Sequence, residues 1–479
     1  MELPDGYVII VSRECETCRE LVPAFRELAG NGIGVVFVSQ DDAGFPDGVS
    51  GVVDDSDLEL SWRLAVEVTP TAIRIEGGVP GRRIIGWRKS EWAEFFGVPG
   101  LAPDLPDHRP GCGSLTLLPG VPERLAVRYG GGPVLASRRI EFGAMEDEHE
   151  AMFARGWTDG LPVVPPTMER VYAMLGGTRR AADEVIGIIP PDYRECTVEK
   201  AAVNAVMAGC RPEYLPVVLA AVQALAAEPF NAHGVAATTW YSGPVVVVNG
   251  PIATRIGMNS EHNAFGPGNR ANASIGRALN LIVRNVGGSR PGEVDRSTQG
   301  HPTKYTMAFA EREYDSPWTS LATERGVPQG RSAVTLFAGQ GPTPISDQKS
   351  RGPDSLTRSL AAGLRTVRHS KAAGPVAALV AVAPEHARIF GAAGWDKERL
   401  RGEIIDLLSI PDTELVAGAG GMDEGLAAPA TGAVVAKFKP ENLWFVHVGG
   451  GAGGSSGIIS GWVAGPKGST MVTIPIEED

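Results

Sequence analysis

Residues 7–18, YVIIVSRECETC, decide the fold of the N-terminal part of the chain. The first six are apolar apart from the closing serine and rich in β-branched side chains, which predicts a buried strand. The run leads directly into Cys15 and Cys18, and a helical pattern follows over residues 19–29, before Gly30. At a helix start, backbone amides and the helix dipole stabilise a thiolate and lower the pKa of the first cysteine. The stretch therefore predicts a strand that presents a reactive thiol.

The following residues extend this start into an alternating pattern. Further strands are predicted at residues 34–39, 72–76 and 83–86, and further helices at residues 56–66 and 90–96. The resulting order, strand-helix-strand-helix-strand-strand-helix, indicates a small α/β domain.

The Cys-x-x-Cys pair at the end of the first strand has a defined chemistry. A Cys15 thiolate attacks a disulfide, and Cys18, one helical turn away, resolves the mixed disulfide. The same spacing also makes half of a zinc site, but no second cysteine or histidine pair lies nearby to complete four ligands. The motif therefore favours a redox dithiol over zinc.

The first 97 residues resemble the thioredoxin-like superfamily. The likeness rests on the position of the dithiol, on Pro23 in the following helix, on Thr69-Pro70-Thr71, which is similar to the family's cis-proline loop, and on the hairpin and closing helix. The resemblance implies a thioredoxin fold in which Cys15 is the attacking thiol, Cys18 the resolving thiol, and Pro70 shapes the substrate groove.

The chain departs from the family pattern in two ways. The usual first strand and helix are missing, because residue 7 already begins the strand that carries the motif. Glu14 and Glu16 flank Cys15, and like charge disfavours a thiolate, whereas Arg13 and Arg19 are candidate counter-charges. A fold kept for binding, with an idle dithiol, remains the alternative reading.

Residues 99–139 are rich in proline and glycine, which predicts a linker region between the thioredoxin-like domain, residues 1–98, and the rest of the chain. This region holds Cys112 between two glycines. Such a setting suits an exposed, adaptable thiol, so Cys112 is a candidate receiver for the dithiol, although a lone loop cysteine is also an ordinary finding.

Residues 140–479 are predicted to form one large α/β or α+β domain, with a second boundary considered near 320–330. Its clearest strands are residues 243–249, 333–338 and 376–382, and helical patterns follow them. Residues 156–167, 195–222 and 316–326 resemble an uncharacterised bacterial family, which transfers no activity and no catalytic residue. The predicted fold class is therefore α/β, a thioredoxin-like domain fused to a large α/β or α+β domain.

Two cysteines bracket a predicted helix at residues 197–208. In a helix Cys196 and Cys210 lie about 20 Å apart, too far for a disulfide or a shared metal. Cys196 is the preferred reactive thiol because it stands at the helix start, and Cys210 is second because Arg211 follows it. Burial of both as small apolar side chains is the alternative.

Loops beside the strand at residues 243–249 carry polar residues that are candidates for ligand binding. They are His233, Glu261, His262, Asn263 and Arg270, with His301 further along the chain. No closely spaced histidine pair occurs, so a metal is left open and unidentified.

A glycine-rich run at residues 449–454 contains Gly449 and Gly451 in the spacing of a dinucleotide-binding turn. Neither a good helix nor a following acid accompanies it, which disfavours a nucleotide cofactor. A backbone cradle for an anion and a plain turn both stay open.

Composition restricts the class of protein. The 479 residues include 44 basic and 56 acidic side chains, a net charge of −12, which argues against a nucleic-acid partner. Five cysteines, an odd number, exclude a disulfide-stapled scaffold. The acidic N-terminus lacks the features of a signal peptide, and the most apolar stretch, residues 214–227, is too short for a membrane span. We expect a cytoplasmic enzyme with reduced cysteines and no membrane contact, and leave oligomerisation open.

The leading functional hypothesis is a thiol-dependent enzyme. The Cys15–Cys18 dithiol would reduce, or relay sulfur to, the active site of the fused domain acting on a small molecule, with Cys112 or Cys196 as receiver and an external thiol as reductant. Tethering would give an effective concentration near millimolar. One alternative is a metal-dependent or acid–base lyase or hydrolase, with the thioredoxin-like part as a docking module and with groups from Cys196, His233, Glu261, His262 and His301. Another is a chaperone-like assembly factor.

Overall fold

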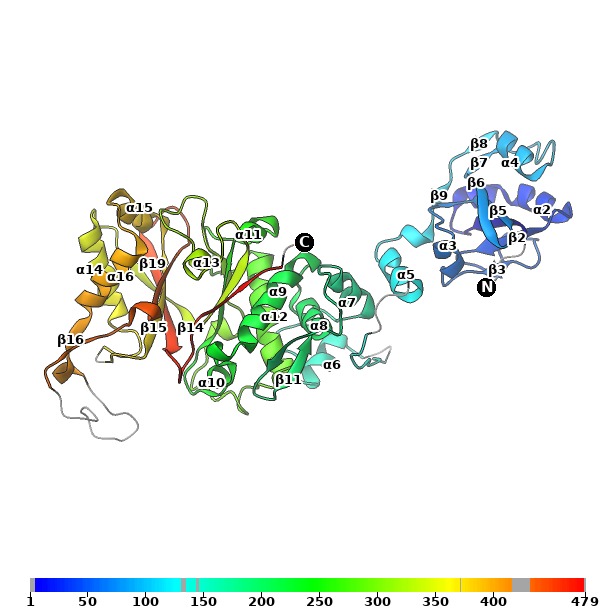
Figure 1. The fold of residues 1–479 in the computed structure, drawn as a ribbon. Helices are drawn as coiled ribbons and strands as arrows, with labels where there is room; N and C mark the ends of the chain where they lie inside the picture. Colours follow the sequence, from blue (N-terminus) through cyan, green and yellow to red (C-terminus); the bar gives the residue numbers. More distant parts are fainter. Residues whose placement is uncertain (1–4, 131–134, 144–145, 371, 416–430, 478–479) are drawn as a thin grey trace. The chain divides into compact units, whose positions relative to one another are not determined.

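The computed structural model describes residues 5–130, 135–143, 146–370, 372–415 and 431–477. The chain folds as two compact units, Met1–Val134 and Leu135–Asp479. Both are α/β, the first with a small mixed sheet and the second with a larger mixed sheet and helices (Figure 1), which confirms the predicted fold class.

The first unit is built on a five-stranded sheet in the order β3-β2-β1-β5-β6. The central strand β1 runs parallel to β2 and antiparallel to β5. The strands are β1 (Gly6–Val11), β2 (Val35–Ser39), β3 (Val53–Asp54), β5 (Thr71–Glu76) and β6 (Val79–Ile85), and the helices are α1 (Glu16–Glu20), α2 (Val22–Gly30), α3 (Glu59–Arg63) and α4 (Lys89–Phe96).

Side chains alternate along β1, so both faces of this sheet are buried. Ile9 and Val11 pack with apolar residues of α2 and α4, whereas Val8 and Ile10 pack with Leu60 and Leu64, in and just after α3. The helix predicted over residues 19–29 is divided after α1, and Pro23 lies in the first turn of α2, where its missing N–H is not needed.

Residues 99–130, expected within a linker region, contain short ordered elements of the first unit. Strand β8 (His108–Arg109) pairs with β7 (Trp87–Arg88), and β9 (Cys112–Gly113) pairs with β4 (Val68–Thr69). A 3-10 turn at Leu115–Leu117 and α5 (Val121–Tyr129) follow. Leu101 is fully buried in the core of this unit.

The second unit contains a seven-stranded sheet in the order β13-β12-β14-β19-β15-β18, with β20 paired to β14. The two outer pairs, β13–β12 and β15–β18, are parallel, and the pairs between them are antiparallel. The strands are β12 (Gly243–Asn249), β13 (Ala308–Ala310), β14 (Ala333–Ser346), β15 (Val376–Val382), β18 (Leu443–His447), β19 (Ser455–Val463) and β20 (Val472–Pro475).

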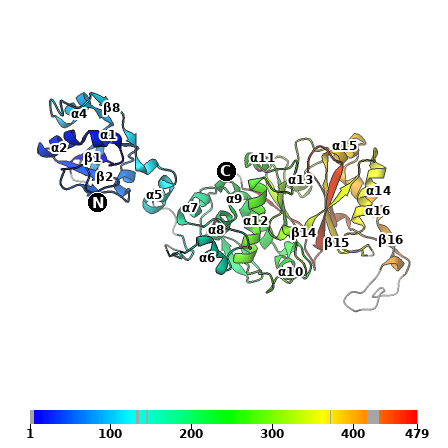
Figure 2. The ribbon, with the colours of Figure 1, turned by 180° about the vertical axis from the view of Figure 1, so that it is seen from behind.

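Helices cover this sheet in two groups. Figures 1 and 2 show α8, α9 and α12 at one end of the sheet and α14, α15 and α16 at the other, and each group has its own apolar core. The helices are α6 (Glu148–Ala154), α7 (Met168–Leu175), α8 (Val198–Ala208), α9 (Leu215–Ala226), α10 (Ala232–Ala237), α11 (Pro251–Arg255), α12 (Arg270–Asn285), α13 (Leu321–Glu324), α14 (Pro353–Leu364), α15 (Pro384–Ala392) and α16 (Lys397–Leu407). Two small sheets pair β10 (Val185–Ile189) with β11 (Arg194–Thr197) and β16 (Ser409–Pro411) with β17 (Val434–Ala436).

The face of the sheet opposite these helices forms a third apolar core, built largely from residues of its own strands. Val245 and Val247 of β12 share this core with Leu379 and Ala381 of β15. The Arg312 amide, just after β13, donates to the His447 carbonyl of β18 at 2.7 Å, so the two outer strands meet at their C-terminal ends.

In the described part of the chain, no single helix has the length and hydrophobicity of a membrane span. The pair Pro212–Ala226 and Glu228–Ala237 meets these criteria only when taken together, and it is bent by 72°.

Candidate functional site

Three cysteine side chains converge at the C-terminal end of β1. Cys15 is 3% exposed and caps the N-terminus of α1: its Sγ accepts from the Cys18 amide at 3.2 Å and lies 3.4 Å from the Thr69 carbonyl. Cys18 is fully buried beneath it. The sequence therefore predicted the position of the dithiol relative to strand and helix.

Asp41, just after β2, shapes the loop that delivers Cys15. Its carboxylate accepts from the Ser12 hydroxyl at 2.7 Å, the Arg13 amide at 2.8 Å and the Glu14 amide at 2.9 Å. These three bonds satisfy loop donors that no strand partner could serve, and they fix the chain direction between β1 and α1.

The third cysteine reaches the site through an unforeseen strand pairing. Cys112 lies opposite Thr69 in the β4–β9 pair, and the Thr69–Pro70 peptide bond beside it is cis. A side chain at Gly111 would place a Cβ 2.1 Å from Val68 Cγ1 and 3.0 Å from the Thr69 carbonyl oxygen. Only glycine therefore allows β9 to approach β4 this closely and to present Cys112 to Cys15.

The three thiols have unequal acidities. The hydrogen bond with the Cys18 side chain, supported by Cys112, the Cys18 amide and Thr69, lowers the pKa of Cys15 to about 5 against the opposing effect of burial. Burial raises the pKa of Cys18 well above its ordinary value, and burial followed by the bond to Cys15 raises the pKa of Cys112. At neutral pH the site holds one thiolate between two protonated thiols.

The charged neighbours in the sequence do not govern this thiolate. Glu14 and Glu16 are exposed, and the net shift of the Cys15 pKa is downward, opposite to the expected effect of their charges. Arg13 is not the counter-charge, because its guanidinium pairs with Asp42 and with Asp47 at 2.8 Å. Hydrogen bonds from neighbouring thiols and amides determine the acidity instead.

Cys196 and Cys210 lie in the second unit and are not activated. Cys196 lies on β11 and is fully buried. Thr197, and not Cys196 as predicted, occupies the start of α8 as its N-cap residue. Burial raises the pKa of each thiol to about 12, and Arg270, whose Nε donates to the Gly209 carbonyl at 2.8 Å, counteracts this only in part at Cys210.

Some of the polar loop residues selected from the sequence do lie together. The Gly449 amide donates to Ser260 at 2.9 Å, and a Cβ at Gly450 would lie 2.4 Å from His262 Cδ2, so the glycine-rich run packs on the loop that carries His262. Tyr314 donates to Glu261 at 2.6 Å at the same place.

The remaining candidates are dispersed or only loosely connected. His233 contacts the Tyr193 hydroxyl at 2.8 Å, Asn263 donates to Pro267, and Gly451 lies in the loop beyond Gly449. His301 lines a separate cavity. Among the described residues, no group of three or more His, Cys, Asp or Glu side chains is arranged to hold a metal ion.

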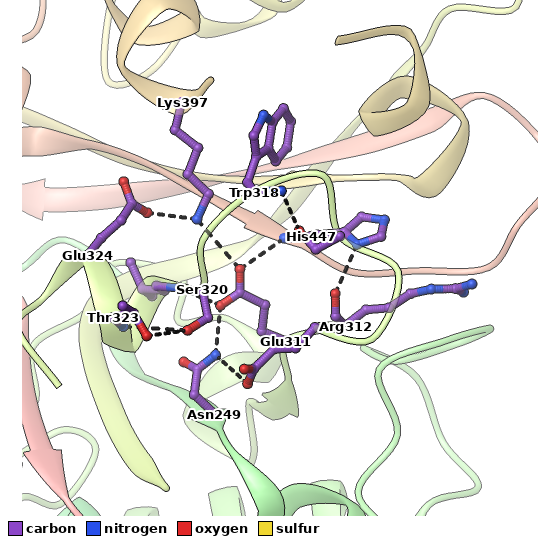
Figure 3. A network of polar contacts seen from close by, with 12 residues as sticks. Asn249, Glu311, Arg312, Trp318, Ser320, Thr323, Glu324, Lys397 and His447 are labelled. Atoms are coloured by element: carbon purple, nitrogen blue, oxygen red, sulfur yellow. Dashed lines mark hydrogen bonds and ion pairs between the residues drawn. The ribbon is translucent and has the colours of Figure 1, made fainter. Parts of the chain in front are cut away.

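A buried polar network that no sequence pattern predicts lies where β12, β13 and β18 end (Figure 3). The Glu311 side chain is completely buried and accepts from Asn249 Nδ2 at 2.7 Å and from the Leu321 amide at 2.7 Å. Lys397 Nζ lies 3.6 Å from Glu311 and 2.7 Å from Glu324. The network joins both ends of the sheet to α13 and α16, so its contacts indicate a structural role.

Comparison with known proteins gives no relative: no family model matches the chain, and neither a curated protein nor a solved structure is significantly similar to it.

Proposed function

We propose that the N-terminal unit is a thioredoxin-like module for thiol–disulfide exchange. The dithiol at the end of a central strand, the cis Thr69–Pro70 bond beside it and the mixed sheet support this reading. The observation that carries it is the Cys15 sulfur, which is bonded to the Cys18 amide, faces Cys112 and has a pKa lowered to about 5. Pro70 would shape the groove in which a substrate sulfur approaches.

In this proposal Cys112 is the receiving thiol. It is half-buried, whereas Cys15 and Cys18 are buried, so Cys112 is the sulfur best placed to form a mixed disulfide with an incoming substrate. Cys196 is not proposed as receiver, because its thiol is buried and protonated.

The exchange then proceeds in three steps. Cys112 loses its proton and attacks the substrate disulfide, which forms the mixed disulfide and releases the first substrate sulfur as a thiolate that takes up a proton. The Cys15 thiolate then attacks the Cys112 sulfur, and the second substrate sulfur leaves and takes up a proton. Cys18 next loses its proton and attacks the Cys15 sulfur, which releases Cys112 and leaves a Cys15–Cys18 disulfide. Two electrons have passed to the substrate, and an external dithiol restores the pair. The larger unit would bind the small molecule whose sulfur chemistry this dithiol serves.

The Cys18→Ser variant tests the order of these steps. Oxidised with one equivalent of glutathione disulfide, it should accumulate a Cys15–Cys112 disulfide, which peptide mass mapping detects. Cys210→Ser is the matched control, since its thiol is buried in the core of the second unit and the substitution should leave the Cys15–Cys18 product unchanged. A Cys18→Ser protein that carries only glutathione on Cys15 would contradict the role of Cys112.

A further inference from the structure

The second unit contains a partly open cavity of about 490 Å³ between the start of β12, α10, α12 and the loop that ends at Tyr305. This volume lies within the range of sites for small organic molecules. Its lining includes the apolar side chains of Leu225, Phe230, Val235 and Val283. The polar and charged side chains of the lining include Asp159, Ser242, Arg284, Asp295, His301 and Lys304.

Among the charged side chains of the lining, one cation has no hydrogen-bond or ion-pair partner in the described part of the chain. Asp159 is held by Arg277 through two bonds of 2.8 Å, and Asp295 is held by Lys304 at 2.6 Å. Arg284, in contrast, makes no hydrogen bond or ion pair with any described residue, and its Nε is buried.

Burial, and after it the charge of Arg290, lowers the pKa of Arg284, whereas the charges of Asp159 in the lining and of Glu293 raise it. The cavity therefore presents a single guanidinium whose donors are free for a ligand.

Two neutral side chains of the lining, Ser242 and His301, add hydrogen-bonding groups to the cavity. Ser242 is completely buried, and its hydroxyl has no hydrogen-bond partner, which is unfavourable unless a bound molecule supplies one. His301 Nδ1 accepts from the Gly341 amide at 3.2 Å and the Thr303 amide at 3.3 Å, so the neutral ring carries its proton on Nε2.

We propose that this cavity binds a small organic carboxylate with an apolar body. The planar guanidinium of Arg284 matches a carboxylate through two parallel bonds, Ser242 pairs with a polar group of the ligand, and the apolar lining residues contact the remainder. One unpaired positive charge fits a singly charged acid better than a phosphate dianion, and it repels cations. The site does not depend on the thiol chemistry, so either proposal can fail without the other.

The test uses the full chain and pairs of probes that share a carbon skeleton and differ in carrying a carboxylate or an uncharged alcohol. Hexanoate, benzoate and phenylacetate are titrated calorimetrically against hexanol, benzyl alcohol and phenylethanol. We expect saturable binding of at least one acid at one site per chain, at least about tenfold tighter than its alcohol. Arg284→Met should abolish this preference, Arg284→Lys should retain part of it, and Ser242→Ala should weaken acid binding a few-fold.

Arg358→Met is the matched control, because Arg358 is exposed on α14 outside the cavity lining. It should bind like the unaltered protein, and thermal unfolding of every variant verifies that each one is folded. Equal affinity for acid and alcohol in every pair, absence of acid binding, or an acid preference that survives Arg284→Met in a folded protein would overturn the proposal.

Discussion

At the residue scale, the acidity of Cys15 depends on donors rather than on charges. The neighbouring thiols of Cys18 and Cys112 and the Cys18 amide stabilise its thiolate, while burial opposes it. A thiolate made in this way is buried, and it gains stability only as long as each donor stays in place. Removing a single donor should therefore shift the titration of Cys15 measurably.

The thiolate absorbance of the reduced protein should rise as pH increases through about 5, the lowered pKa of Cys15, instead of near the ordinary thiol value of about 8.5. Subtracting the signal of Cys15→Ser isolates this group. Cys112→Ala removes one donor and should move the midpoint upward, whereas Cys112→Ser keeps a hydroxyl donor and should move it less. A midpoint near the ordinary value in the unaltered protein would refute this account.

At the element scale, the site depends on β9 lying against β4. Gly111→Ala puts a methyl group 2.1 Å from Val68 Cγ1, so β9 must move away and take Cys112 with it. We expect a several-fold lower yield of the Cys15–Cys112 disulfide in a Cys18→Ser background, measured by mass mapping. Gly113→Ala is the matched control because nothing lies within 4 Å of its Cβ position. Equal yields from both variants would show that the close approach is not required.

The Glu311–Lys397 contact holds together elements from both ends of the large sheet. Lys397→Met leaves the buried Glu311 carboxylate without its cation and should lower the free energy of unfolding by about 3–5 kcal/mol at neutral pH. Denaturant titration measures this, and Glu311→Gln combined with Lys397→Met should recover much of the loss. Failure of the double variant to recover stability would indicate that packing, and not charge, dominates.

The pH dependence of that variant has a definite sign. Burial raises the pKa of Glu311, so its folded-state pKa exceeds the unfolded value of about 4.3. A raised carboxyl pKa contributes stability below the unfolded value, and that contribution is lost as pH rises through the folded pKa. The difference in the free energy of unfolding between Lys397→Met and the unaltered protein should therefore decrease as the pH falls. Unfolding curves at a series of pH values measure this. A difference that is constant across this range would exclude Glu311 as its cause.

Local patterns predicted the elements but not the contacts between distant ones. The strands formed by the apolar run before Cys15 and by the valine run of β12 could be predicted, because a buried strand needs apolar residues at neighbouring positions. The approach of Cys112 to Cys15 needs the pairing of β9 with β4, and Glu311, just after β13, meets Lys397 at the start of α16 only once the sheet and this helix have packed together. Neither has a periodic signal, since each joins segments far apart in the chain.

At the scale of the whole molecule, the position at which the first unit ends determines which groups can act on Cys15 and which contacts stabilise the unit. The residues with the largest effects on the pKa of Cys15, which are Cys18, Cys112 and Thr69, belong to Met1–Val134. The segment after residue 98 also supplies the fully buried Leu101, the Pro106 carbonyl that accepts from Trp87 Nε1 at 2.7 Å, and the Pro110 carbonyl that accepts from Thr17 at 2.7 Å. The segment after residue 98 thus contributes both to the acidity of Cys15 and to the stability of the first unit.

Two fragments test this boundary. The fragment of residues 1–130 should fold alone and keep the Cys15 titration near pH 5. The fragment of residues 1–98 should unfold at lower denaturant concentration and titrate at higher pH, because it lacks both the buried contacts and the Cys112 donor. Circular dichroism and thiolate absorbance measure the two properties, with Cys112→Ala in the longer fragment separating the donor from the packing. If the shorter fragment matched the longer one in both, residues 99–130 would be a linker after all, and the thiolate would owe nothing to Cys112.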